Sequence, residues 1–526
     1  MKQRYFLSIL LLSVALNLMS QGYKNPILSG FYPDPSICRV GEDYFLVNSS
    51  FQYFPGVPIH HSRDLTHWEL VGYCITRPSQ TRIENIGFWN GIYAPTIRYH
   101  DGVFYMVTTN TSDRGNFYVT TTNPKGEWSD PIWVDQPGID PDLFFDDNGK
   151  TYFMSARGGG WMQLAEIDLK SGSLLTEGRE IWRGTGGRCA EAPHLYKKDG
   201  FYYLMIAEGG TEYGHKVTIA RSRHIYGPYE SCPHNPILTH VNATGYQNPI
   251  QGTGHADIIQ AHDGSWWMVC LGFRPQTGIH HLLGRETFLA PVKWSEDGWP
   301  IVNGNGTISL DMNVPTLPSH LYETSPARDN FNQQQLALSW NYICSPRTEC
   351  YSLSERPGFL RMKAAPVGLD SNDSPAFIGR RQQHIDFQTT TLLDASALAE
   401  DAEAGLTVYM GNSYHYDLIA SCRKGQIELG VRYKLSHLDH IYATTTIHPQ
   451  KVYLRVCGDK DKYAFYYSTD GINYHSLAAL DCRFLSTETA GGFTGIFIGL
   501  FTQSKSTIPS HADFDWFEYI GTSKLK

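Results

Sequence analysis

The feature that most constrains the fold is a repeat in the first 300 or so residues. Five short segments rich in aromatic residues recur, and four of them open with an Asp-Gly or Asn-Gly pair. Such a pair between apolar runs is a strong signal for a β-hairpin. The segments are EDYFLVNSS from residue 42, DGVFYMVTT from 101, NGKTYFMSA from 148, DGFYYLMIA from 199 and DGSWWMVCL from 263.

Each aromatic segment has a companion roughly ten residues upstream that carries a proline or a polar residue. The companions are PDPSI from residue 33, YAPTI from 93, IDPDL from 139, EAPHL from 191 and GHADI from 254. The whole unit returns about every 50–60 residues, close to the period of a propeller blade. We therefore expect an all-β chain that begins with a five-bladed β-propeller, with the companion strands innermost around its axis.

The pattern of strand segments changes after the repeat. We expect the propeller over 24–312 and a proline-containing linker over 313–328. Short strands with little helical periodicity follow over 329–523, and they predict a concanavalin-like (jelly-roll) β-sandwich.

The N-terminus has the pattern of a signal peptide. Lys2 and Arg4 precede an apolar run that ends at Leu18, and small and polar residues follow. A membrane anchor is the alternative, but the run is shorter than the ~20 residues that a spanning helix needs. We expect a signal peptide over 1–20 and an exported protein, periplasmic or extracellular, without a membrane span.

Charge and cysteine content exclude several classes. The net charge of −9 and the lack of a basic run argue against nucleic acid as a partner. Ten cysteines are too sparse for a disulfide scaffold, and none has zinc-site spacing, so we expect mostly buried thiols. Cys344 and Cys350 are the one pair considered for a disulfide.

Three companions carry an acid at their first or second position: Asp34, Asp140 and Glu191. Each alone reads as a turn residue, and the proline after Asp34 predicts that Asp34 is extended. Together, on strands that line one axis, they provide the two carboxylates of glycoside hydrolysis and a third acid to adjust a pKa. Asp142, two residues along the strand, is expected on the same face as Asp140.

These residues lie in motifs that resemble glycoside hydrolase family 43, the β-xylosidase and α-L-arabinofuranosidase group. The resemblance extends over nearly the whole mature chain. It is carried by NPILSGFYPDPSI, GIYAPTIRYHDGVFY, GIDPDLFFDDNGK, AEAPHLYKKDGFYYLMIAEGGT, GTGHADI and LGRETFLAPVKW, and in the second half by PARDNFNQQQLALSW and GGFTGIFIGLFTQ.

The resemblance implies an inverting single displacement. Asp34 matches the general base, Glu191 the general acid, and Asp140 the aspartate that modulates the pKa of the acid. Inversion needs the base and acid ~6.5–9.5 Å apart, so that a water molecule fits between them.

The resemblance also suggests substrate-binding residues, each with a simpler alternative. Arg285 resembles the arginine that holds sugar hydroxyls, although a salt bridge would also explain it. Further candidates, for which core packing or a loop role is the alternative, are Phe51, Trp89, Tyr93, Thr211, His255 and Phe493. Tyr93 stands where the family usually has tryptophan, which leaves the sugar preference at that wall open.

No cofactor is required by these motifs, and no catalytic metal is predicted. Related enzymes sometimes hold a calcium ion near the axial histidine, here His255, which implies a structural calcium near the propeller axis. A buried histidine without a metal is the alternative.

We expect an exo-glycosidase that removes β-D-xylosyl or α-L-arabinofuranosyl residues from the non-reducing ends of xylan-type plant hemicellulose oligosaccharides. The alternatives are an endo-arabinanase of the same fold and a non-catalytic glycan-binding protein. The sequence specifies neither the preferred pentose nor the oligomeric state.

Overall fold

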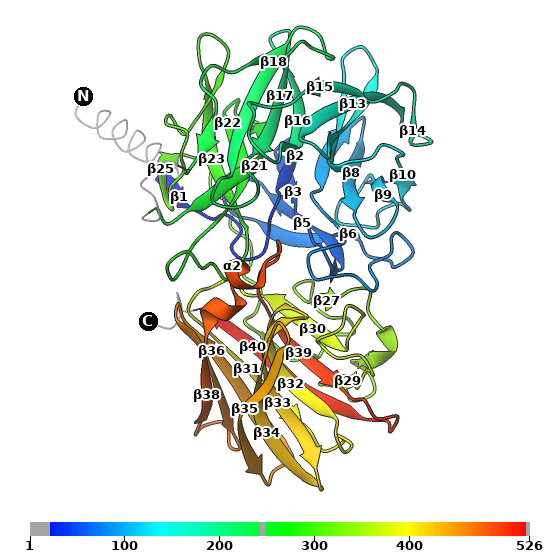
Figure 1. Ribbon diagram of the computed structural model, residues 1–526, viewed down its shortest axis with the longest axis vertical. Coiled ribbons are helices and arrows are strands. Elements are labelled where there is room, and N and C mark those ends of the chain that lie inside the picture. The colour runs from blue at the N-terminus through cyan, green and yellow to red at the C-terminus, as the bar shows by residue number, and fades with distance from the viewer. Residues whose placement is uncertain (1–20, 242–247, 522–526) are drawn as a thin grey trace, which may run out of the picture.

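The structure is a computed structural model that describes residues 21–241 and 248–521. The expected signal peptide, residues 1–20, lies outside the described residues. Figure 1 shows two β-domains, with the first, from blue to green, packed on the second, from yellow to red. In the described part of the chain, no helix is long and apolar enough to cross a membrane.

The first domain consists of five antiparallel sheets, one for each sequence repeat. Blade one contains β2 (Ser36–Val40), β3 (Asp43–Val47), β5 (Gly56–Ser62) and β6 (Glu69–Ile75). Blade two contains β7 (Thr96–His100), β8 (Val103–Asn110), β9 (Gly115–Thr121) and β10 (Ile132–Trp133). Blade three contains β11 (Ile139–Phe145), β12 (Thr151–Arg157), β13 (Trp161–Asp168), β14 (Ser173–Leu174) and β15 (Arg179–Trp182).

Blade four contains β16 (Glu191–Lys198), β17 (Phe201–Glu208), β18 (Lys216–Ser222), β19 (Glu230–Ser231) and β20 (Leu238–Thr239). Blade five contains β21 (Gln251–Gln260), β22 (Trp266–Phe273), β23 (Glu286–Trp294) and β24 (Pro300–Val302). The two ends of this domain are joined by β1 (Gln21–Lys24), which pairs with β25 (Asp311–Pro315).

The hairpins form where the sequence predicts them. Asp101 and Gly102 have φ of 47° and 82°, and Asp199 and Gly200 have φ of 49° and 74°. Positive φ at both central residues is the type I′ turn that matches the twist of antiparallel strands. The aromatic segments accordingly form the second strand of each blade and their companions the first.

The first strands close a ring. Strand β2 contacts β7, β7 contacts β11, β11 contacts β16, β16 contacts β21, and β21 contacts β2. The expectation of a five-bladed propeller with the companion strands around the axis is therefore confirmed.

A polar network ties the first strands of the five blades together. Arg98 donates to Asp142 and to Asp257, each at 2.9 Å. Ser36 donates to Asp257 at 2.7 Å, and His194 lies 3.3 Å from Asp142. Asp142 is fully buried in this ion cluster, so its contacts are structural and are not those of Asp140.

The second domain is a sandwich of two sheets. The larger sheet contains β26 (Arg328–Asp329), β28 (Tyr351–Ser352), β29 (Leu360–Lys363), β31 (Phe387–Asp394), β36 (Lys451–Gly458), β37 (Lys462–Ser468), β38 (His475–Asp481) and β40 (His511–Gly521). The smaller contains β30 (Phe377–Arg381), β32 (Glu403–Gly411), β33 (Tyr414–Arg423), β34 (Gln426–Leu435), β35 (Leu438–Ile447) and β39 (Phe497–Gln503). The core between them is aliphatic and aromatic, and short helical turns η2 (Thr348–Cys350), η3 (Cys482–Leu485) and α2 (Thr487–Ala490) connect strands.

The two domains share a core. Strand β4 (Tyr53–Phe54) of the propeller pairs with β27 (Tyr342–Ile343) of the second domain. Tyr53 stacks on Phe497 with ring centroids 3.9 Å apart, and Phe31 contacts the same ring. Figure 1 shows α2 and β27 at this junction.

The cysteines carry no disulfide among the described residues. Cys344 and Cys350 are both free and buried, so the suggested pair does not form. The Cys344 thiol instead points to the carbonyl of Asn372. Most of the ten cysteines are buried, as expected.

Candidate active site

The candidate site lies at the start of the first strands, where the backbone leaves regular β geometry. Asp34, Asp140, Ala192 and His255 all have φ between 45° and 54°. The strand register also shifts beside the last three, between Ile139 and Asp142, between Glu191 and His194, and between Gly254 and Ala256. Such bulges redirect side chains, and left-handed φ at a non-glycine residue costs about 1–3 kcal/mol.

The expectation that Asp34 is extended is therefore wrong. The preference of a residue before proline is local, and tertiary contacts outweigh it here. The Asp34 carboxylate, only 4% exposed, accepts hydrogen bonds from Ser49 Oγ and from Arg285. These partners hold the side chain toward the axis.

Asp34 is surrounded by cationic and donor groups. Arg285 Nη1 donates to Oδ1 at 2.7 Å and Nη2 to Oδ2 at 3.3 Å, and His255 Nδ1 lies 3.6 Å from Oδ1. Burial alone would raise the pKa of Asp34, but Arg285, His255 and Ser49 lower it below its ordinary value. The carboxylate is therefore ionised at neutral pH.

Asp140 and Glu191 have raised pKa values, in contrast to the lowered pKa of Asp34. Burial and the nearby charges of Glu191 and Asp34 raise the pKa of Asp140 well above its ordinary value. Burial and the charge of Asp34 raise the pKa of Glu191 to about 7. Asp140 Oδ2 accepts from the backbone N–H of Ala192 at 3.0 Å, next to Glu191. Glu191 is the first residue of its companion segment, whereas Asp34 and Asp140 are each the second residue of theirs.

Arg285 contacts Asp34 and one residue from each domain. Its Nη1 also donates to Thr211 Oγ1 at 2.9 Å, and its Nη2 to the carbonyl of Phe493 at 3.2 Å. Of the salt bridges that are the alternative for Arg285, one on the surface is excluded, because Arg285 is 6% exposed. One between blades is present, because Arg285 of blade five pairs with Asp34 of blade one.

Four aromatic side chains gather beside Arg285. Phe51 lies 5.2 Å from Tyr93 and 6.1 Å from Phe493, measured between ring centroids. Trp89 lies 6.3 Å from Phe493, which comes from the second domain. Phe51 is 2% exposed, whereas Trp89 is 39% exposed, so Trp89 forms the outer part of this cluster.

Comparison with known proteins identifies the family. The model for glycosyl hydrolases family 43 matches residues 23–300, and the model for the β-xylosidase C-terminal concanavalin A-like domain matches residues 328–520. The chain belongs to glycoside hydrolase family 43.

Several relatives of this family 43 hydrolase are similar along almost their whole length. A non-reducing end α-L-arabinofuranosidase of Bacteroides ovatus is 42% identical over 512 residues, covering 96% of each chain. A xylosidase/arabinosidase of Butyrivibrio fibrisolvens is 38% identical, covering 94% of this chain and 98% of the relative. The solved structure described as Bacteroides ovatus xyloglucan PUL GH43B superposes with a TM-score of 0.92 at 42% identity, covering 95% of this chain and all (100%) of that one.

Sequence reasoning did not single out two residues of the hydrolase site, Ser49 and His215. Hydroxyl and imidazole groups at these positions give no periodic signal in the sequence. His215 Nδ1 lies 3.1 Å from the Gly252 carbonyl, and the ring packs against Gly254. Burial lowers the pKa of His215 to about 3 and that of His255 to about 4, so both rings are neutral at pH 7.

The structural calcium ion is expected near His255, on the propeller axis. No three His, Cys, Asp or Glu side chains among them surround a common point. Asp142 and Asp257, which lie on two of the strands around the axis, are both paired with Arg98, which would repel a cation. The calcium ion stays a prediction.

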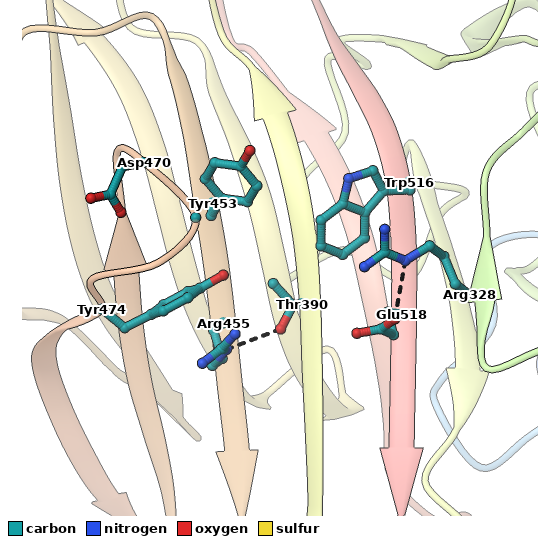
Figure 2. Close-up of a pocket in the computed structure, with 9 residues that line it drawn as sticks. Arg328, Thr390, Tyr453, Arg455, Asp470, Tyr474, Trp516 and Glu518 are labelled. Carbon is teal, nitrogen blue, oxygen red and sulfur yellow. Dashed lines mark hydrogen bonds and ion pairs between the residues drawn. The ribbon is translucent and has the colours of Figure 1, made fainter.

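A separate hollow of about 310 Å³ lies on the larger sheet of the sandwich (Figure 2). Arg328 covers the ring of Trp516 at 3.9 Å, and Arg455 covers that of Tyr474 at 3.3 Å. Glu518 is paired with Arg328. Because its aromatic faces and its glutamate are already engaged, this hollow is not the site of hydrolysis.

Proposed function

We propose that this family 43 hydrolase removes β-D-xylosyl or α-L-arabinofuranosyl residues, one at a time, from the non-reducing ends of hemicellulose oligosaccharides. The observation that carries the proposal is the opposite charge state of two acids on one axis. Asp34 has a lowered pKa and Glu191 a raised one, which are the states required of a base and an acid.

In the proposed mechanism, Asp34 accepts a proton from a water molecule as the water oxygen attacks the anomeric carbon. Glu191 gives its proton to the glycosidic oxygen as the bond to the leaving sugar breaks. One proton is taken up and one released, so the enzyme exchanges protons with solvent between turnovers. Water enters on the face opposite the leaving group, so the configuration is inverted.

The other side chains have distinct parts in this proposal. Burial and the charge of Asp34 keep the proton on Glu191, where it is available to the substrate. Asp140 matches the modulating aspartate of the family, and it holds the backbone next to Glu191 by accepting from the N–H of Ala192. Arg285 and the aromatic cluster of Phe51, Trp89, Tyr93 and Phe493 bind the terminal sugar.

Two features favour exo-action on a pentose. Phe493 comes from the sandwich domain and stands beside Trp89 and Tyr93, which narrows the site from one side. The relatives described as α-L-arabinofuranosidase and xylosidase/arabinosidase support the two sugars.

A panel of aryl β-D-xylosides, aryl α-L-arabinofuranosides and xylo- and arabino-oligosaccharides tests the proposal. We expect release of a pentose monosaccharide, and NMR should show that the first-formed product has the inverted anomeric configuration. Oligosaccharide products from linear arabinan would favour the endo-arabinanase. Binding without turnover of any substrate would favour a glycan-binding protein.

We also propose that residues 1–20 direct export. Expression of the full chain in a bacterial host, followed by cell fractionation and N-terminal sequencing, should give a shortened protein outside the cytoplasm. An intact N-terminus in the cytoplasmic fraction would contradict export.

A further inference from the structure

A segment of the sandwich runs along a segment of the propeller that leads directly into Arg285. The N–H of Thr487 donates to the carbonyl of His281 at 3.4 Å, and the N–H of Ile496 to that of Leu282 at 3.3 Å. Gly284 and Gly495 lie so close that a Cβ on Gly284 would be 2.9 Å from the Gly495 Cα. We call residues 486–496 the closing segment; it contains Phe493 and α2, and Figure 1 shows α2 where the two domains meet.

One carboxylate fixes the far end of the closing segment. Glu488 Oε2 accepts from the backbone N–H of His281 at 3.0 Å, and Oε1 lies 2.6 Å from His281 Nδ1, which donates to it. The His281 ring is 4% exposed and stacks on Phe273 at 4.2 Å between centroids. Both oxygens of Glu488 therefore hold a single residue of the other domain.

The Glu488 carboxylate is ionised and largely shielded from solvent. The side chain of Glu488 is 15% exposed. Burial alone would raise the pKa of Glu488, but the hydrogen bonds and charge of His281 lower it. Charge-assisted hydrogen bonds of this kind are about twice as strong as neutral ones.

The near end of the closing segment contacts the catalytic machinery. The carbonyl of Phe493 accepts from Arg285 Nη2 at 3.2 Å, and the same guanidinium holds both oxygens of Asp34. Any displacement of the closing segment therefore removes an acceptor that orients the partner of the proposed base.

We propose that Glu488 and His281 form an inter-domain latch that positions the Phe493 carbonyl, and through it Arg285 and Asp34. Both are positioning residues, since neither contacts the reacting atoms. The inference rests on the proposed function, because it assigns Asp34 as the base that the latch orients. The sandwich domain thus contributes to the chemistry of the base as well as to the shape of the pocket.

The test compares Glu488→Gln with wild type in the full chain. This substitution keeps the shape of the side chain but removes its charge, and the single amide oxygen can accept from only one of the two His281 donors. We expect kcat/KM on aryl pentosides to fall roughly 10- to 100-fold, as for other misplacements remote from the chemistry. The acidic limb of the pH profile should move to higher pH, because Arg285 is less well held against Asp34.

A second readout does not depend on activity. Hydrogen exchange measured by mass spectrometry should become faster in residues 486–496 of Glu488→Gln and stay unchanged in the remote strand β34. Glu488→Asp, which keeps the charge on a shorter side chain, should lie between Glu488→Gln and wild type in both measurements. If Glu488→Gln does not fold, Ser486→Ala is compared with wild type in its place. It removes the 2.7 Å contact that joins Ser486 Oγ, in the closing segment, to His280 Nδ1 of the propeller.

The matched control is Thr277→Val. It removes another hydrogen bond between the domains, from Thr277 Oγ1 to the Lys460 carbonyl at 2.7 Å, outside the closing segment. It should leave the acidic limb in place. The latch would be overturned if Glu488→Gln had the same acidic limb and the same exchange rates as wild type. A wild-type chain without turnover would instead overturn the proposed function. In that case the exchange rates alone would decide whether the latch exists.

Discussion

At the scale of single residues, two acids of the site have different protonation states because their surroundings differ. Asp34 has Arg285 beside it, whereas Glu191 is buried near the negative charge of Asp34. We expect kcat/KM to fall as the pH rises through about 7, where Glu191 loses its proton. The acidic limb should lie below 3.8, the ordinary pKa of an aspartate, because Arg285 stabilises the charged form of Asp34.

A pH–rate profile of kcat/KM on one aryl pentoside measures both limbs, over the range in which the protein stays folded. Because Asp140 and Glu191 titrate as a pair, the basic limb reports the pair and not one carboxyl alone. In Asp140→Asn, which removes one member, the basic limb should move. A basic limb at the same pH in both proteins would contradict the pairing.

The proton of Glu191 makes a second prediction at this scale. Glu191→Ala should lose roughly 100- to 10,000-fold in kcat on substrates with poor leaving groups and much less on substrates with good ones, which need little protonation. Steady-state kinetics on a series of aryl glycosides with leaving groups of graded pKa measures the difference. Equal losses along the series would argue against an acid role, and Glu230→Ala, which removes an exposed partner of Arg221, is the control.

At the scale of elements, the start of β21 is shaped by a glycine. A Cβ on Gly254 would lie 2.4 Å from ring atoms of His215, and Gly254 does not need a positive φ. Gly254→Ala should therefore push His215 aside, move the neighbouring His255 and reduce kcat/KM by roughly 10-fold or more. Gly158→Ala is the control, because a Cβ there meets no atom within 4 Å. Kinetics and thermal unfolding of both variants check this.

The sequence predicts elements better than it predicts how they bend. Asp-Gly turns and aromatic strands depend on neighbours in the chain, so the five hairpins could be placed from the sequence. The left-handed backbone of Asp34 and the bulge between Asp140 and Asp142 depend on partners far along the chain. For Asp34 these partners are Arg285 and Ser49, and for Asp142 the partner is Arg98. Rules based on neighbouring residues take no account of such distant contacts. They therefore predict an extended Asp34, and they predict that Asp142 lies on the same face as Asp140.

At the scale of the whole molecule, the two domains share one apolar cluster. The cluster around Phe31, Phe51 and Tyr53 of the propeller includes Phe497 and Phe501 of the sandwich. Separating the domains would expose these rings to water, at about 25 cal/mol for each Å² of apolar surface. We therefore expect the full chain to unfold in a single cooperative transition.

Differential scanning calorimetry of the wild type and of Phe497→Ala tests this expectation. Removing the Phe497 ring from its stack on Tyr53 should lower the free energy of unfolding by roughly 3–5 kcal/mol. The midpoint temperature of the single transition should therefore fall, and the transition should not split in two. Ile472→Ala, at a side chain that is 82% exposed in the sandwich, is the control and should leave the transition in place. Two transitions in the wild type, of which Phe497→Ala lowers only one, would show that the propeller is stable without the sandwich. In that case the shared core would serve to hold the closing segment over Arg285 and would not be needed to fold the propeller.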